Sequence, residues 1–163
     1  MPTATLSMPG YIDKVVLRFQ RLLRTGKAQA ASPSVYVPPS YGKSTQYTHV
    51  DTSAVLSPSD KLEMQELVGC LLYYARAIDC TMLPSVNHIA SELSTLTQLV
   101  QIVGQRLLAY GPAYPNNELV YHASDMILCV QSDCSHLSRH HARSVVGGIG
   151  YLGSTAERSY RSQ

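Results

Sequence analysis

A chain of 163 residues with 45% apolar residues can bury a hydrophobic core and does not have the composition of a disordered protein. Charged residues make up only 15% of the chain, which favours a piece of a larger protein whose surface is partly covered. The net charge of +2 is too small to indicate a nucleic-acid partner by itself.

The cysteines and the N-terminal segment bear on the cellular compartment. Cys70, Cys80, Cys129 and Cys134 are scattered, and the opening residues MPTATLSMPG lack the basic and apolar regions of a signal peptide. The apolar run at residues 67–75 is too short for a bilayer, which takes about 20 residues. We therefore expect reduced thiols, a cytoplasmic or nuclear location and no membrane partner.

The first predicted element is an amphipathic helix at residues 10–24. Apolar residues recur there at helical spacing after the turn signal Pro9-Gly10, and Gly26 is a plausible stop. Residues 27–58 are different, because prolines interrupt a run of serine, threonine and tyrosine that has no sustained period. This composition predicts an extended linker or a loop that lies along a neighbour.

A second helix is predicted to run from the capping sequence Ser57-Pro58-Ser59-Asp60 to about residue 78. Serine is a favoured N-cap, and proline suits the first helical turn. The residues expected to face inward from this helix are Leu62, Gln65, Val68, Leu71, Leu72 and Ala75.

Two more helices are predicted before residue 111. Pro84 suits the first turn of one, which continues to about residue 93, and Thr95 or Thr97 can cap the other. The residues expected to face inward from the last helix are Leu99, Ile102, Val103, Arg106, Leu107 and Tyr110. Short connections between consecutive helices predict a small helical subdomain.

The period changes from helical to extended after residue 117. Residues 119–121, 126–131 and 144–152 predict three short strands, with a polar, histidine-rich loop between the last two. Short links favour antiparallel pairing. The sequence therefore predicts an α+β fold, in which helices precede an antiparallel sheet.

Five sequence blocks resemble the polyproteins of copia-like retrotransposons and occur in the order found in that family, from about residue 8 to residue 154. They are Met8-Pro9-Gly10-Tyr11-Ile12, Val68-Gly69-Cys70-Leu71-Leu72-Tyr73-Tyr74-Ala75-Arg76-Ala77 with Asp79, Tyr121-His122-Ala123-Ser124-Asp125-Met126, Ser132-Asp133-Cys134-Ser135-His136-Leu137, and Ala142-Arg143-Ser144 with Gly147-Gly148.

This resemblance implies a stretch of reverse transcriptase that runs into ribonuclease H. Residues 1–26 would end the palm-like region, residues 27–58 would be a linker, and residues 59–117 would form the helical connection region. Residues 118–154 would be the N-terminal strands of a truncated ribonuclease H-like domain, and residues 155–163 a divergent tail. The implied fold is a subdomain of three to four helices followed by an incomplete antiparallel ribonuclease H-like sheet.

Asp133 is the candidate catalytic and metal-binding residue, because the resemblance matches it to a metal-binding aspartate of the family. Ribonuclease H cleavage uses two magnesium or manganese ions held by several carboxylates, so a lone aspartate cannot hold the pair. Glu157 follows the last strand too closely to be the next ligand, and Asp125 lies at the opposite end of the strand that carries Asp133. The chain also lacks the adjacent aspartates of a polymerase site.

We therefore expect Asp133 to be vestigial and this chain alone to bind no cofactor and to be inactive. In the intact parent, which would copy RNA into DNA and degrade the RNA strand, the implied partners are an RNA–DNA hybrid and the rest of the polyprotein. Arg139 and Arg143 are the candidate nucleic-acid contacts, although a solvated loop explains a small basic cluster more simply. The alternative is a non-catalytic helical module, derived from a retroelement, that binds a protein partner.

A zinc site is the other interpretation of residues 129–141. Cys129, Cys134, His136 and either His140 or His141 supply ligand types that zinc prefers, but their spacing is not a standard one. The two cysteines are an odd number of residues apart, so a continuous strand would point them to opposite faces. We expect them to pack as small hydrophobic residues.

Overall fold

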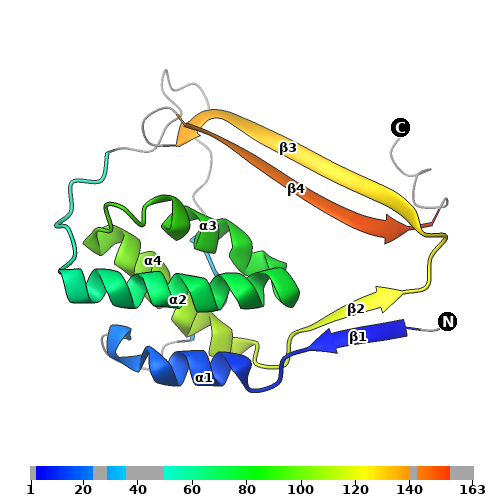
Figure 1. The fold of residues 1–163 in the computed structure, drawn as a ribbon, viewed down its shortest axis with the longest axis horizontal. Coiled ribbons are helices and arrows are strands. Elements are labelled where there is room, and N and C mark those ends of the chain that lie inside the picture. Colours follow the sequence, from blue (N-terminus) through cyan, green and yellow to red (C-terminus); the bar gives the residue numbers. More distant parts are fainter. Residues whose placement is uncertain (1–2, 24–28, 36–49, 140–142, 155–163) are drawn as a thin grey trace. The chain divides into compact units, whose positions relative to one another are not determined.

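Four α-helices and two antiparallel two-stranded sheets form the described part of the chain (Figure 1), which confirms the α+β class. The computed structural model describes residues 3–23, 29–35, 50–139 and 143–154. The chain divides into two units. Thr5–Val37 and Asp51–Val120 form the helical unit, and the other unit contains a long β-hairpin within Tyr121–Gln163.

The first helix is shorter than predicted. α1 spans Tyr11–Arg18 and starts after Gly10, whose φ of 70° lies in the left-handed region that favours glycine. A 3₁₀ turn, Gln20–Leu22, follows and turns the buried side chain of Leu22 into the core. Gly26, the predicted stop, lies outside the described residues.

The second helix, α2, begins and ends as predicted, at Pro58–Ala77. The Ser57 hydroxyl accepts a hydrogen bond from the Asp60 N–H at 3.2 Å, which caps the helix. The predicted inner face is wrong in part, because Leu62 and Gln65 are exposed. The face that packs inward is rotated toward other positions, and its buried residues are Met64, Leu67, Val68, Leu71, Tyr74 and Ala75.

Two shorter helices complete the helical unit. A 3₁₀ turn, Cys80–Met82, leads into α3, Leu83–Ser91, and Thr97 rather than Thr95 caps α4, Gln98–Tyr110. A further 3₁₀ turn, Gly111–Ala113, follows α4.

The predicted inner face of α4 is also wrong in part. Leu99 and Ile102 are exposed, whereas the neighbouring Val100 and Gly104 are buried. A Cβ atom on Gly104 would lie 2.6 Å from Cε of Met64 in α2, the flexible end of that side chain. The buried face of α4 therefore packs against Met64.

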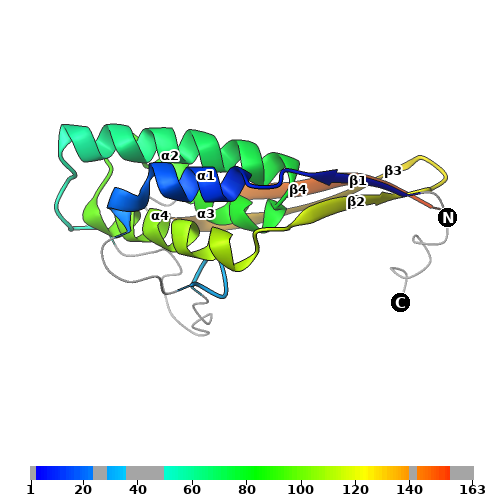
Figure 2. The same cartoon turned by 90° about the horizontal axis from the view of Figure 1, so that it is seen from below.

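The core of the helical unit lies where the other helices meet α2 (Figures 1 and 2). α1 runs alongside α2, and the Tyr11 ring stacks on Tyr74 with centroids 5.7 Å apart. Each fully buried aliphatic side chain contributes roughly 1.5–3 kcal/mol to stability. The largest fully buried side chains are Phe19, Met64, Leu67, Leu71, Met82, Val86, Ile89, Leu96, Leu107 and Leu108.

The described residues of the predicted linker lie along α3 and α4. The Ala30 N–H donates to the Ala109 carbonyl at 3.1 Å, and the Ser85 hydroxyl donates to the Pro33 carbonyl at 3.1 Å. The only strand-like feature in the described part of this segment is an isolated antiparallel bridge between Val55 and Thr97.

The first sheet pairs β1, Thr3–Ser7, with β2, Glu118–His122. The sequence predicted β2 but not β1. Because β1 precedes α1 and β2 follows α4, this pairing joins segments that are far apart in the chain.

The second sheet is the hairpin formed by β3, Ile127–Arg139, and β4, Arg143–Gly153 (Figure 1). The predicted pairing is confirmed, and Asp133 lies opposite Gly147 in its register. The predicted loop after residue 131 is wrong, because the polar residues that follow continue the ladder with β4. Their side chains are largely exposed, so polarity does not prevent them from forming a strand.

No helix among the described residues is long and apolar enough to cross a membrane.

Candidate functional site

Asp133, the candidate metal ligand, lies within β3 and is exposed. Its register partner is Gly147, which has no side chain to cover the carboxylate. The Cys134 N–H donates a hydrogen bond to Asp133 Oδ1 at 2.8 Å. The carboxylate therefore sits on an open part of the hairpin, with a local backbone contact.

A second carboxylate does not converge on Asp133 within the described residues. Asp125 precedes β3, and its N–H contacts the Ser154 hydroxyl at 3.4 Å. β3 starts at Ile127, and the extended chain from there to Asp133 covers roughly 20 Å, which keeps the two aspartates apart. Glu157 lies outside the described residues, and among those described no group of three potential metal ligands is found.

The two candidate arginines lie at the closed end of the hairpin. The register places Arg139 directly opposite Arg143, after an irregularity in the ladder beyond Ser135. Arg143 is exposed. The hairpin thus brings two basic residues to one position of the ladder.

The candidate zinc ligands are separated by the strand geometry. Cys129 and Cys134 both belong to β3 and are free thiols, the first half-buried and the second exposed. Their odd spacing points them to opposite faces of the continuous strand. His136 is exposed, while His140 and His141 lie outside the described residues.

A polar cleft in the helical unit is a site that the sequence did not predict. Its volume is about 310 Å³, and α4, the N-terminus of α2, the segment before α2 and the turn after α1 line it. The lining residues are Arg21, Leu22, Val55, Leu56, Ser57, Asp60, Gln98, Gln101 and Gln105.

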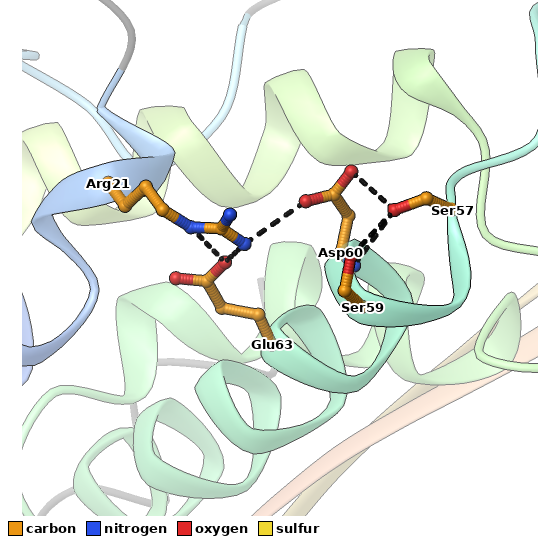
Figure 3. Close-up of polar contacts among 5 residues, drawn as sticks. All are labelled: Arg21, Ser57, Ser59, Asp60 and Glu63. Atoms are coloured by element: carbon orange, nitrogen blue, oxygen red, sulfur yellow. Dashed lines mark hydrogen bonds and ion pairs between the residues drawn. The ribbon is translucent and has the colours of Figure 1, made fainter.

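Three lining residues of this cleft, Arg21, Ser57 and Asp60, belong to a network of polar contacts (Figure 3). The Arg21 guanidinium donates to Asp60 Oδ1 at 3.1 Å and also binds Glu63. The hydrogen bond that Arg21 donates to Glu63 raises the pKa of Arg21, and the negative charge of Glu63 acts in the same direction. The Ser57 hydroxyl donates to the second carboxylate oxygen of Asp60 at 2.8 Å, so the network is anchored to the helix cap.

A buried polar cluster surrounds Asp79, which follows α2. The Thr81 N–H donates to Asp79 Oδ1 at 3.1 Å, the Thr81 hydroxyl contacts the same oxygen, and Asn117 Nδ2 donates to Oδ2 at 2.8 Å. The Tyr110 hydroxyl lies 3.1 Å from the Thr81 hydroxyl. Burial raises the pKa of Tyr110 and of Tyr74, which both lie near Asp79. The saturated hydrogen bonding of Asp79 indicates a structural role.

The sequence carries weak signals for these two sites. The spacing of Gln98, Gln101 and Gln105 places three carboxamides on one side of a helix. Asp79-Cys80-Thr81 is a local pattern in which the aspartate accepts from the backbone two residues ahead. Neither pattern identifies the distant residues that complete the site.

Comparison of the chain with protein-family models, with curated proteins and with solved structures found no match. The resemblance to retrotransposon polyproteins therefore stays a prediction that rests on the sequence blocks.

Proposed function

We propose that this chain is a piece of a copia-like retrotransposon polyprotein, from the connection region of reverse transcriptase into the start of ribonuclease H. The observation that carries the proposal is the occurrence of five sequence blocks in the family's order between about residue 8 and residue 154. The parent protein would copy RNA into DNA and degrade the RNA strand of the hybrid.

The hairpin supports this proposal because the resemblance requires two consecutive antiparallel strands around the metal-binding aspartate. β3 and β4 are paired in that way, and Asp133 lies in the middle of the ladder. The ribonuclease H-like identity of this sheet is part of the proposal.

Cleavage of RNA depends on how many carboxylates lie beside Asp133 to hold the metal ions. Two divalent cations, magnesium or manganese, would be held in the parent by Asp133 together with acidic residues from other segments. In the described part of this chain no group of three potential metal ligands is found. We therefore infer that the chain alone does not cleave RNA and that Asp133 contributes one ligand to a site completed elsewhere.

An RNA–DNA hybrid is the proposed partner of the hairpin end. The register pairs the backbones of Arg139 and Arg143. Arginine binds phosphate through charge-assisted hydrogen bonds, which is the contact that we propose for this end of the hairpin.

Fluorescence anisotropy of a labelled RNA–DNA hybrid, measured over a range of salt concentrations, tests this proposal. We expect affinity to fall as salt rises, and we expect Arg143→Gln to weaken binding and lower the salt slope by about one. Arg18→Gln is the matched control, because it removes the same charge from an exposed arginine that Glu66 already neutralises. A salt-independent affinity, or an equal effect of both variants, would contradict the proposal.

A non-catalytic module that binds a protein partner is the second candidate function. The polar cleft of the helical unit favours it, because binding at that cleft would not require any metal or nucleic acid.

A further inference from the structure

We propose that the free edge of β4 pairs with the same edge of a second copy of this chain, which joins two hairpins into one antiparallel sheet. Within the described residues β4 pairs only with β3, so its other edge is open. The inference does not depend on the retrotransposon proposal, since it uses neither a metal site nor a nucleic acid.

The open edge of β4 is accessible over most of its length. Each residue from Arg143 to Leu152 is exposed. Backbone groups of successive residues in a strand point to alternate sides, so every second residue of β4 directs its N–H and C=O away from β3. Within the described residues, no backbone hydrogen bond outside the ladder uses residues 145–152. These outward groups can therefore pair with another strand.

The two edges of the hairpin differ in charge. β4 has no charged residue and no proline from Ser144 to Gly153, whereas β3 carries Asp133 in the middle of the ladder. Charged side chains and proline are features that protect a strand edge against pairing with another chain. The edge of β4 lacks both in this range, so it is the edge that accepts another strand.

A second copy fits this edge because β4 is complementary to itself in an antiparallel register. The register is centred on Ile149, which lies opposite Ile149 of the second copy. Val146 then lies opposite Leu152, which forms an apolar pair. Gly147 lies opposite Tyr151, whose ring covers the bare backbone of the glycine. No like charges meet along this register.

The glycine at position 147 is explained by this pairing. Among the described glycines only Gly10 has a positive φ, so the backbone at Gly147 does not require glycine. A Cβ atom on Gly147 would meet no atom within 4 Å, so packing within the hairpin does not require it either. A glycine inside a strand weakens the strand and often marks the close approach of another backbone.

The pairing also extends the exposed apolar face of the hairpin. Val130 and Val146 lie on this face and are 65% and 78% exposed. A two-fold axis perpendicular to the sheet places the apolar faces of both copies on the same side. Contact along one strand is small beside the roughly 800 Å² per partner of a stable complex, so we expect the dimer to dissociate on dilution.

Charge exchange at position 149 tests the pairing in the full chain. Sedimentation equilibrium gives the Kd of the dimer for the natural chain, for Ile149→Lys, for Ile149→Glu and for an equimolar mixture of the two variants. Like charges lie directly opposite each other in each single variant, and opposite charges do so in the mixture. We expect each single variant to raise the Kd about tenfold, and the mixture to return it to within about threefold of the natural value.

Gln131 provides the matched control, because it is the register partner of Ile149 on β3 and is exposed. Gln131→Lys and Gln131→Glu place the same charges on the same face of the hairpin, but on the strand whose edge is not proposed to pair. We expect each of them to change the Kd by no more than about twofold, and their mixture to associate no more tightly than either variant.

Hydrogen exchange of the natural chain covers the case in which a substitution at position 149 disturbs the hairpin. Amides that bond to the second copy exchange more slowly at high protein concentration, so we expect concentration-dependent protection in β4 and none in β3. The proposal is overturned if exchange in β4 does not depend on concentration, or if the mixture of Ile149→Lys and Ile149→Glu associates no better than the single variants. An equal loss of association in the Gln131 variants, or assemblies larger than two chains, would overturn it as well.

Discussion

Asp79 follows α2 and is linked by hydrogen bonds to the next turn and to the segment before β2. It is only 5% exposed, and hydrogen-bond donors from Thr81 and Asn117 satisfy both of its carboxylate oxygens. Removing a buried acceptor leaves its donors without partners, which costs more than the hydrogen bond itself contributes.

We predict that Asp79→Ala lowers the free energy of unfolding by roughly 2–3 kcal/mol, because it leaves several donors unsatisfied. Asp79→Asn should cost less, since it keeps one acceptor oxygen. Urea denaturation of the natural chain and both variants measures the difference. A loss below about 0.5 kcal/mol for Asp79→Ala would mean that water replaces the carboxylate.

Tyr74 provides a prediction about pH. Burial raises the pKa of Tyr74 above its ordinary value of 10.0, and the charge of Asp79 acts in the same direction. The neutral ring is thus favoured more in the folded chain than in the unfolded one. Its contribution to stability is complete below about pH 10 and is lost as pH rises through the raised pKa.

We therefore expect the stability of the chain to fall above about pH 10, and Tyr74→Phe to fall less steeply, because phenylalanine does not ionise. Denaturation curves at pH 8 to 11 measure this effect. Tyr121→Phe, at an exposed position in β2, is the matched control. Identical slopes for Tyr74→Phe and the natural chain would contradict the prediction.

Two glycines test how closely the elements are packed. A Cβ atom on Gly111, after α4, would lie 2.8 Å from Cγ2 of Ile12 in α1, and this branched side chain has little freedom to move. A Cβ atom on Gly69, within α2, would meet no atom within 4 Å.

We predict opposite effects of alanine at these two positions. Gly111→Ala should destabilise the chain by roughly 1–3 kcal/mol, because the core cannot accept an added methyl group. Gly69→Ala should stabilise it by about 0.5–1 kcal/mol through helix propensity. Thermal unfolding of both variants is the measurement, and stabilisation by Gly111→Ala would contradict the packing of α1 against the turn after α4.

The boundaries of α2 were predictable because they depend on neighbouring residues, whereas α1 ends earlier than predicted and the sequence left Thr95 and Thr97 open as caps of α4. Ser57 caps α2 and Thr97 caps α4, and both positions follow from local capping chemistry. The inward faces were less predictable, since several positions in α2 and α4 carry apolar side chains all around the helix. Which face is buried depends on tertiary contacts such as that of Gly104 with Met64.

Elements and sites that depend on distant segments could not be predicted. β1 has no strong pattern of its own, and its partner β2 lies at the other end of the helical unit. β3 extends through polar residues because β4 pairs with them. The cleft combines three separate segments of the chain, and neither the helix cap at Ser57 nor the glutamine spacing of α4 indicates that these segments meet.

Among the described residues, β3 and β4 pair with no third strand, so the hairpin resembles an incomplete sheet. Leu128, Val130 and Val146 lie on one of its faces and are 66%, 65% and 78% exposed. Exposed apolar strands with an open edge favour association with other chains.

We predict that the chain self-associates as its concentration rises, and that the double variant Val130→Thr with Val146→Thr reduces this association. Threonine keeps the β-branched shape and makes the face more polar. Light scattering coupled to size exclusion measures the mass. Leu62→Thr, at an exposed apolar position on α2, is the control, and an equal reduction by that variant would argue against the hairpin.

The central proposal is that Asp133 contributes one carboxylate to a ribonuclease H metal site whose other ligands come from other segments. The most direct measurement is cleavage of a labelled RNA–DNA hybrid with magnesium or manganese, by the natural chain and by Asp133→Asn, at concentrations at which binding is confirmed. We predict that the natural chain and Asp133→Asn both bind the hybrid and that neither cleaves it. Cleavage by the natural chain that Asp133→Asn abolishes would show a complete metal site and contradict the claim, and failure of both to bind the hybrid would contradict the proposed partner.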